Sequence, residues 1–189
     1  MKKEITDIIL DSISTSEKIC KTQADGIAKI AEVILDAAKK GNKVLVFGNG
    51  GSAADSQHMA AELVGRFIKD RAPIPAIALT TNTSTLTAVG NDYGFQDVFV
   101  RQLQALGRKG DIAVGISTSG NSDNVIKAIE TAKKSGLTTV VLTGKDGGKL
   151  AKIADLVFIA PSKDTPRIQE SHILVIHAIC QVIEKKMFE

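Results

Sequence analysis

Two glycine- and serine-rich stretches each follow a short apolar run and each precede a helical pattern. They cover residues 47–52 and 115–122. A strand that ends in such a loop before a helix presents backbone N–H groups and a helix dipole to an anion, and serine hydroxyls add further donors. Neither stretch continues into the Gly-Lys-Ser/Thr of a nucleotide-binding P-loop, and the first only loosely resembles a dinucleotide fingerprint. The sequence therefore predicts a site for a small phosphorylated molecule.

The composition argues against nucleic acid or a membrane as partner. The chain carries 24 Lys and Arg against 21 Asp and Glu, a net charge of +3, and it has only 6 Phe and 1 Tyr to stack on bases. No apolar run approaches the roughly 20 residues that span a bilayer. Cys20 and Cys180 have no metal-type spacing, and the amino terminus indicates an amphipathic helix rather than a signal sequence. We expect a cytoplasmic protein with reduced thiols.

Beyond residue 40, short apolar runs alternate with helical patterns. Such alternation is typical of a parallel sheet whose two faces are covered by helices. It predicts one α/β domain over residues 1–189, a doubly wound five-stranded parallel sheet, in which ligands bind beyond the carboxyl ends of the strands. The expected strands are 43–47, 76–79, 111–116, 138–142 and 155–159, and the expected helices are 52–66, 83–90, 97–106, 122–135, 147–153 and 165–186.

Residues 1–40 precede the α/β core of residues 41–189. Two apolar stripes, one up to Cys20 and one from Ile27 to Ala38, predict two leading amphipathic helices. Few strand faces remain for these stripes to cover. We therefore expect the leading helices to pack against another subunit.

The most informative ionisable residues are His58 and Glu62, which stand four apart on the helix after the first loop and so share one face. On the last helix, Gln169 and His177 can both point inward, whereas His172 is off that face and is expected to be exposed or at an interface. Spacing alone fits an ordinary surface pair at His58 and Glu62 equally well. If the four residues converge, they form the mixed N/O shell that a divalent ion accepts.

Such a group beside a phosphate site favours proton transfer on a sugar phosphate. A carboxylate can remove a proton from the carbon next to a carbonyl, and a histidine can pass a proton to the oxygen, which gives an enediol. This chemistry is aldose-ketose isomerisation. No redox fingerprint, activated serine or nucleophilic cysteine signature competes with it.

Five motifs resemble those of the bacterial phosphoheptose isomerases, which are sugar isomerase (SIS) domain proteins. The resemblance covers nearly the whole chain, and it implies conversion of sedoheptulose 7-phosphate to D-glycero-D-manno-heptose 7-phosphate. In that family this reaction is the first step towards the ADP- or GDP-heptose of lipopolysaccharide core or capsule. The motifs are residues 47–52, 90–92, 115–122, 142–148 and 167–170.

The resemblance also implies roles for individual residues and an assembly. Zinc is the expected ion, Glu62 and His177 are the expected acid/base pair, and the family forms homotetramers with active sites at subunit boundaries. The metal positions are His58, Glu62, Gln169 and His177. The phosphate positions are Ser52, Ser117, Thr118, Ser119 and Ser122. The other substrate positions are Asn49, Gly50, Gly51, Glu62, Asn91, Asp92 and Gln169.

Two other functions remain open at this point. A non-catalytic relative of the same fold binds the replication initiator DnaA, but such relatives lack the acidic and histidine pair that Glu62 and His177 supply here, and Asp55 also follows the enzyme pattern. A sugar-phosphate-sensing regulator would normally carry a DNA-binding segment, and residues 1–40 have no basic recognition helix. The isomerase is the favoured interpretation.

Overall fold

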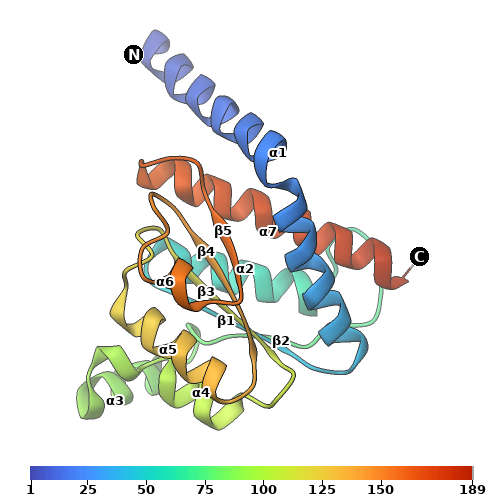
Figure 1. The fold of residues 1–189 in the computed structure, drawn as a ribbon, viewed down its shortest axis with the longest axis vertical. Helices are drawn as coiled ribbons and strands as arrows, with labels where there is room; N and C mark the ends of the chain where they lie inside the picture. Colours follow the sequence, from blue (N-terminus) through green and yellow to red (C-terminus); the bar gives the residue numbers. More distant parts are fainter. Residues whose placement is uncertain (189) are drawn as a thin grey trace.

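The chain folds around one parallel sheet with strand order β2-β1-β3-β4-β5 (Figure 1). The computed structural model describes residues 1–188. Each strand is parallel to its neighbours, which confirms the predicted doubly wound fold. The strands are β1 (Val44–Gly48), β2 (Ala76–Ala78), β3 (Ile112–Ser117), β4 (Thr138–Thr143) and β5 (Leu156–Ile159).

Helices cover both faces of the sheet (Figure 1). Successive strand residues alternate between two apolar clusters: Val44 and Val46 lie with the helices on one face, and Leu45 and Phe47 lie with those on the other. Complete burial of such side chains contributes about 1.5–3 kcal/mol each. The first face carries α1 (Lys2–Lys39), α2 (Gly51–Val64) and α7 (Thr165–Phe188). The second carries α3 (Thr83–Tyr93), η1 (Phe95–Asp97), α4 (Val100–Leu106), α5 (Asp123–Lys134) and α6 (Leu150–Ile153).

Strand order reverses between β1 and β3, and both serine-rich loops follow these two strands. Gly48 at the end of β1 stands opposite Ile116 in β3, so the two loops begin side by side. This point of a doubly wound sheet is where ligands bind. The topology therefore places both predicted phosphate loops at one edge.

The expectation of two leading helices is wrong, because α1 is one continuous helix. Gly26 costs about 1 kcal/mol in a helix interior, but the segment after it buries Ile30 and Ile34 in the core and so holds the helix together. The amino-terminal end of α1 extends past the body (Figure 1), and the apolar stripe near this end is about half exposed. This exposed stripe consists of Ile5, Ile8, Ile9, Leu10 and Ile13.

Two expected helices are shorter than the pattern indicates. The helix expected over 97–106 begins only at Val100, after the 3-10 turn η1. The helix expected over 147–153 is reduced to Leu150–Ile153, because Gly147 and Gly148 have φ of 82° and 57°. These left-handed conformations are incompatible with a right-handed helix.

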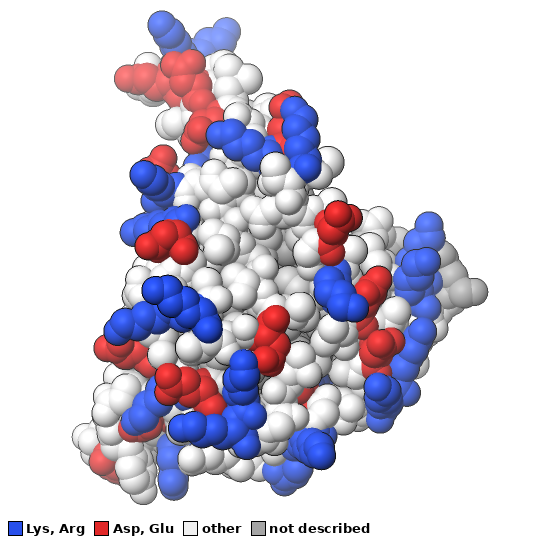
Figure 2. Space-filling model, in the orientation of Figure 1, with Lys and Arg blue, Asp and Glu red and all other residues white. Residues whose placement is uncertain are grey.

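Charges of both signs are mixed over the face shown in Figure 2. This mixture matches the small net charge of the chain and gives no broad basic surface on that face for nucleic acid. In residues 1–188, no helix combines the length and the apolar character needed to cross a bilayer.

The structure corrects the expectation that His172 is exposed or at an interface, because its side chain is fully buried. Nε2 of His172 donates to the carbonyl oxygen of Thr143 at 2.9 Å, and its ring packs edge-on against Phe158. Among the described residues, Nδ1 has no hydrogen-bond partner. Burial lowers the pKa of His172 from 6.5 to about 4, against a smaller opposing effect of the Thr143 carbonyl.

We expect His172 to make the free energy of unfolding depend on pH. Between pH 6.5 and about 4 the unfolded histidine binds a proton and the folded one does not. The contribution of a neutral His172 to the free energy of unfolding is therefore fully present above pH 6.5, and it decreases by up to about 3 kcal/mol as the pH falls to 4. His172→Gln keeps an N–H donor but does not titrate. Urea unfolding between pH 4.5 and 7 should show a flatter pH dependence for this variant, and equal slopes would contradict the assignment.

Candidate active site

The first loop depends on glycine for close approach. A Cβ on Gly48 would stand 2.8 Å from the Ile116 carbonyl oxygen, and Gly50 has φ of 56° at the start of α2. This tight turn sends the chain directly from β1 into α2 and buries Ser52 in the first helical turn. Gly50 and Gly51 stay exposed beside it. The loop thus presents glycine backbone and one serine at the sheet edge.

The second loop gathers hydroxyl groups. Oγ of Ser117 lies 3.0 Å from Oγ of Ser122 and 3.5 Å from Oγ of Ser119, and Thr118 is half-buried between them. Ser122 directly precedes α5, so the hydroxyls lie at the positive end of the helix dipole. Hydroxyl hydrogens rotate to suit a ligand. This cluster can donate several hydrogen bonds to a phosphate.

An amide pair connects the two loops. Nδ2 of Asn49 donates to Oδ1 of Asn124 at 2.9 Å, and Nδ2 of Asn124 donates back to Oδ1 of Asn49 at the same distance. Asn124 is buried in the first turn of α5. The resemblance implies a sugar-binding role for Asn49 and none for Asn124, and no local pattern could reveal a pair that is 75 positions apart in the sequence. The pair holds the two loops at a set separation.

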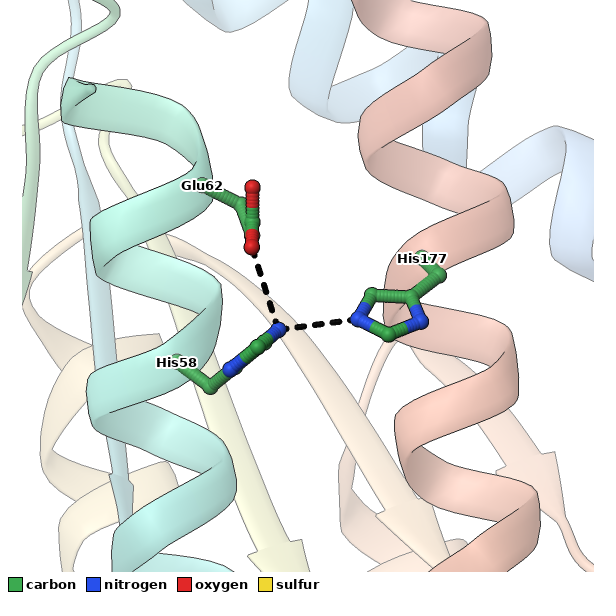
Figure 3. A group of neighbouring side chains, drawn as sticks. All are labelled: His58, Glu62 and His177. Atoms are coloured by element: carbon green, nitrogen blue, oxygen red, sulfur yellow. Dashed lines mark hydrogen bonds and ion pairs between the residues drawn. The ribbon is translucent and has the colours of Figure 1, made fainter. Parts of the chain in front are cut away.

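His58, Glu62 and His177 converge between α2 and α7 (Figure 3). Nε2 of His58 lies 2.8 Å from Nε2 of His177 and 3.2 Å from Oε1 of Glu62. The His58 side chain is 43% exposed and that of Glu62 is 21% exposed, so the group is open to solvent on one side. The spacing prediction that His58 and Glu62 share one face is fulfilled, and α7 adds His177.

The arrangement fits a divalent metal ion. The ligand atoms of the three residues all lie within 4.8 Å of one another. A ring nitrogen carries either one proton or one lone pair, so Nε2 of His58 cannot donate fully to both of its neighbours. A cation between two imidazole nitrogens and a carboxylate oxygen would use three converging lone pairs, and this donor set is that of catalytic zinc sites.

On α2, His58 lies nearly two helical turns and Glu62 nearly three turns beyond Ser52 of the first loop. His58 is six positions after Ser52, which is about 9 Å along the axis of α2. An open-chain seven-carbon sugar phosphate spans a comparable distance from its phosphate to its carbonyl. One substrate of this kind could therefore contact both the serine loops and the metal group.

Two parts of the expected site lie apart from this group within one chain. Gln169 is eight residues before His177, about 12 Å along α7, and its amide lies against Gly51, where Nε2 would stand 2.2 Å from an added Cβ. Asn91 donates to Asp92 on exposed α3, and that helix packs against the opposite face of the sheet from α2 and α7. Their roles in metal and substrate binding stay predictions.

Asp55, three residues before His58 on α2, is a further polar group near the site. Its Oδ2 is buried without a hydrogen-bond partner among the described residues. Burial raises the pKa of Asp55 to about 6, and the charge of His58 opposes this rise. A carboxyl group in this condition can gain or lose a proton near neutral pH.

The comparisons with known proteins agree with this geometry. Residues 10–144 match the sequence profile of a family described as "SIS domain". This match, together with the parallel sheet and the serine loops at its edge, defines the class as that of SIS domain proteins.

Relatives and solved structures narrow the class. The chain is 52% identical over 189 residues to the phosphoheptose isomerase of Aquifex aeolicus, covering 100% of this chain and 99% of that protein. It is similar in structure to the phosphoheptose isomerase of Neisseria gonorrhoeae, with TM-score 0.92, 45% identity, and 97% and 98% of the two chains covered. The Francisella tularensis enzyme gives TM-score 0.94 at 37% identity, with 97% of each chain covered.

The chain belongs to the phosphoheptose isomerases, a family of aldose-ketose isomerases. The alternative of a DnaA-binding relative is not supported by these similarities.

Replacing Asn124 by leucine should weaken phosphate binding. The variant removes the two hydrogen bonds that hold the loops together, so the loops must be ordered when the anion binds; a cost of about 1 kcal/mol for this ordering corresponds to a fivefold rise in the Kd for inorganic phosphate. Titration calorimetry measures this Kd. Thr131→Ala is the control, because the Thr131 hydroxyl donates to the Lys127 carbonyl oxygen within α5 and is no part of the amide pair. An unchanged Kd in folded Asn124→Leu would show that the amide pair does not hold the loops for the anion.

Proposed function

We propose that this protein converts sedoheptulose 7-phosphate into D-glycero-D-manno-heptose 7-phosphate, the first step towards an ADP- or GDP-heptose for lipopolysaccharide core or capsule. The convergence of Glu62 with His58, nearly two to three turns along α2 from the first serine loop, and with His177 carries this proposal. Membership in the phosphoheptose isomerases supports it.

The serine loops would hold the phosphate and so direct the open-chain sugar towards α7. Ser52 and the cluster of Ser117, Thr118, Ser119 and Ser122 donate to the phosphate oxygens, and Asn49, Gly50 and Gly51 line the sugar chain. With the phosphate held at one end, the carbonyl at the other end has few positions to occupy. This restriction replaces a bimolecular encounter by a positioned one.

Glu62 would take a proton from C1 of the ketose, while a proton from His177 goes to the oxygen on C2. The enediol then collapses when Glu62 returns its proton to C2 and His177 accepts the proton of the C1 hydroxyl. Both residues end in their starting states. The two carboxylate oxygens of Glu62 differ, since Oε1 faces His58 and the other is directed away (Figure 3).

Zinc held by His58, Glu62 and His177, with Gln169 supplied by a second copy as a further ligand, would provide an electrophile that polarises the carbonyl. A ligating carboxylate has a reduced proton affinity. We therefore assign one oxygen of Glu62 to the metal and the other to the proton, and likewise one ring nitrogen of His177 to each role.

We also propose a homotetramer with active sites at subunit boundaries. The exposed isoleucine and leucine stripe of α1 supports this assembly, because five large apolar side chains stand about half exposed on the part that projects (Figure 1). An apolar groove of about 330 Å³ lies between α1 and α7, lined by Ile19, Ile27 and Leu174 among others. The placement of Asn91, Asp92 and Gln169 away from the metal group in one chain fits a site that a second copy completes.

Activity is the direct test of the reaction. In deuterium oxide with zinc, the wild type should convert sedoheptulose 7-phosphate to an aldose that carries deuterium at C2, and a chelator should abolish turnover. Glu62→Gln and His177→Gln should lower kcat by about 10² to 10⁴-fold, since each removes a proton-transfer group. Gln57→Ala, on the exposed side of α2, is the control. Absence of turnover by folded, zinc-loaded wild type would refute the proposal.

Light scattering tests the assembly. The wild type should have about four times the 20.0 kDa chain mass at micromolar concentration. Ile9→Glu combined with Ile13→Glu places charges in the exposed stripe and should lower the mass, whereas Thr22→Glu, at an exposed polar position of the same helix, should not. A monomeric wild type would rule out the tetramer.

A further inference from the structure

The segment after α2 is held by one carboxylate. Residues 65–75 contain no helix or strand, yet three consecutive backbone N–H groups in it, those of Phe67, Ile68 and Lys69, donate to the side chain of Glu184 on α7. The N···O distances are 3.2, 3.0 and 3.0 Å. Burial raises the pKa of Glu184, but the hydrogen bonds from these three N–H groups and from Arg71 together outweigh that effect. The pKa of Glu184 is therefore below its usual value. Glu184 is therefore ionised and fixed in place.

Arg71 connects the same carboxylate to the end of α2. Its Nε donates to Oε2 of Glu184 at 3.1 Å, and both side chains are at most 4% exposed. Its Nη2 donates to the Glu62 carbonyl oxygen at 2.8 Å, and its Nη1 donates to the Leu63 carbonyl oxygen at 2.8 Å. The last carbonyls of a helix lack partners within it, and a cation there also suits the helix dipole.

The buried pair of Arg71 and Glu184 is connected to the metal group on both helices, through the backbone of Glu62 on α2 and through Phe67, which packs on His177 of α7. Arg71 binds the backbone of Glu62, whose carboxylate faces His58. The ring of Phe67, in the segment bound by Glu184, packs against the ring of His177 with centroids 5.8 Å apart. Glu184 follows His177 by seven residues, two turns along the same face of α7.

We propose that Arg71 and Glu184 are positioning residues for the isomerisation. By fixing the last turn of α2 and the segment that carries Phe67, they hold the Glu62 carboxylate and the His177 ring at the separation that the reaction requires. A buried ion pair adds little stability over an apolar pair of similar size, since desolvation offsets the attraction. An apolar pair could not bind the Glu62 carbonyl or the three N–H groups. The charged pair therefore contributes mainly by fixing the backbone positions of these groups. The inference rests on the proposed function.

Arg71→Lys separates positioning from folding. Lysine keeps the charge beside Glu184, but a single ammonium cannot also reach the carbonyls of Glu62 and Leu63 in the forked geometry of arginine. We expect a folded protein with KM within about twofold of wild type and kcat lowered by about 10- to 100-fold, as for a catalytic group displaced by a fraction of an ångström to one ångström. Zinc affinity, measured by chelator competition, should fall with kcat.

A second readout is independent of turnover. In the metal-free protein, ¹⁵N spectra of the histidine rings should show changed shifts for His58 and His177 in Arg71→Lys, and also in Glu184→Gln if that variant folds. Arg71→Ala should be impaired at least as strongly in both readouts. If the wild type proves inactive, the proposed function fails, and the ring shifts still decide whether Arg71 positions the group.

The matched control is Asp111→Asn. Asp111 is also a buried carboxylate that accepts two backbone N–H groups, of Lys43 and Arg108, and pairs with the Lys43 ammonium, but it stands at the amino end of β3, away from the site. Its loss should lower stability and leave kcat, zinc affinity and the ring shifts of the folded protein unchanged. The proposal is overturned if Arg71→Lys retains wild-type kcat and ring shifts, or if Asp111→Asn lowers kcat equally.

Discussion

The parallel pairing of β1 with β3 is the interaction on which the rest of the structure depends. Gly48 stands opposite Ile116, and at this register both strands end together and their loops lie side by side. From this edge, α2 returns over one face of the sheet and α5 over the other, because right-handed crossovers from strands at a reversal of order lead to opposite sides. The amide pair of Asn49 and Asn124 then joins the loops across the reversal.

The packing of α2 against α7 adds the chemistry. Met59 and Leu63 of α2 lie in the same apolar cluster as Ile176 and Ile179 of α7. With this contact made, the polar side chains on the neighbouring faces of the two helices meet, and three of them form the metal-type group. Hydrophobic packing thus sets the distance between His58 and Glu62 on α2 and His177 on α7, and the proposed positioning role of the buried Arg71–Glu184 pair would act on the same distance.

Local pattern predicted the strands and most helices well, and failed where long-range packing decided the outcome. The continuity of α1 across Gly26 depends on contacts with α7, which no local pattern contains. His172 is buried because α7 turns that face towards β4, where the Thr143 carbonyl oxygen accepts a hydrogen bond from its Nε2. Gly147 and Gly148 shorten α6 because both adopt positive φ angles, which two adjacent glycines allow but do not require.

The candidate site divides in the same way. The sequence by itself determined the two serine loops and the shared face of His58 and Glu62, because strand alternation, glycine and the helical repeat of 3.6 residues are local properties. Only the tertiary structure decided that His177 meets them, that Asn124 pairs with Asn49, and that the Gln169 amide lies against Gly51. Those contacts join residues from different elements, and their separation follows from how helices pack on a sheet, which depends on the summed shape of many side chains.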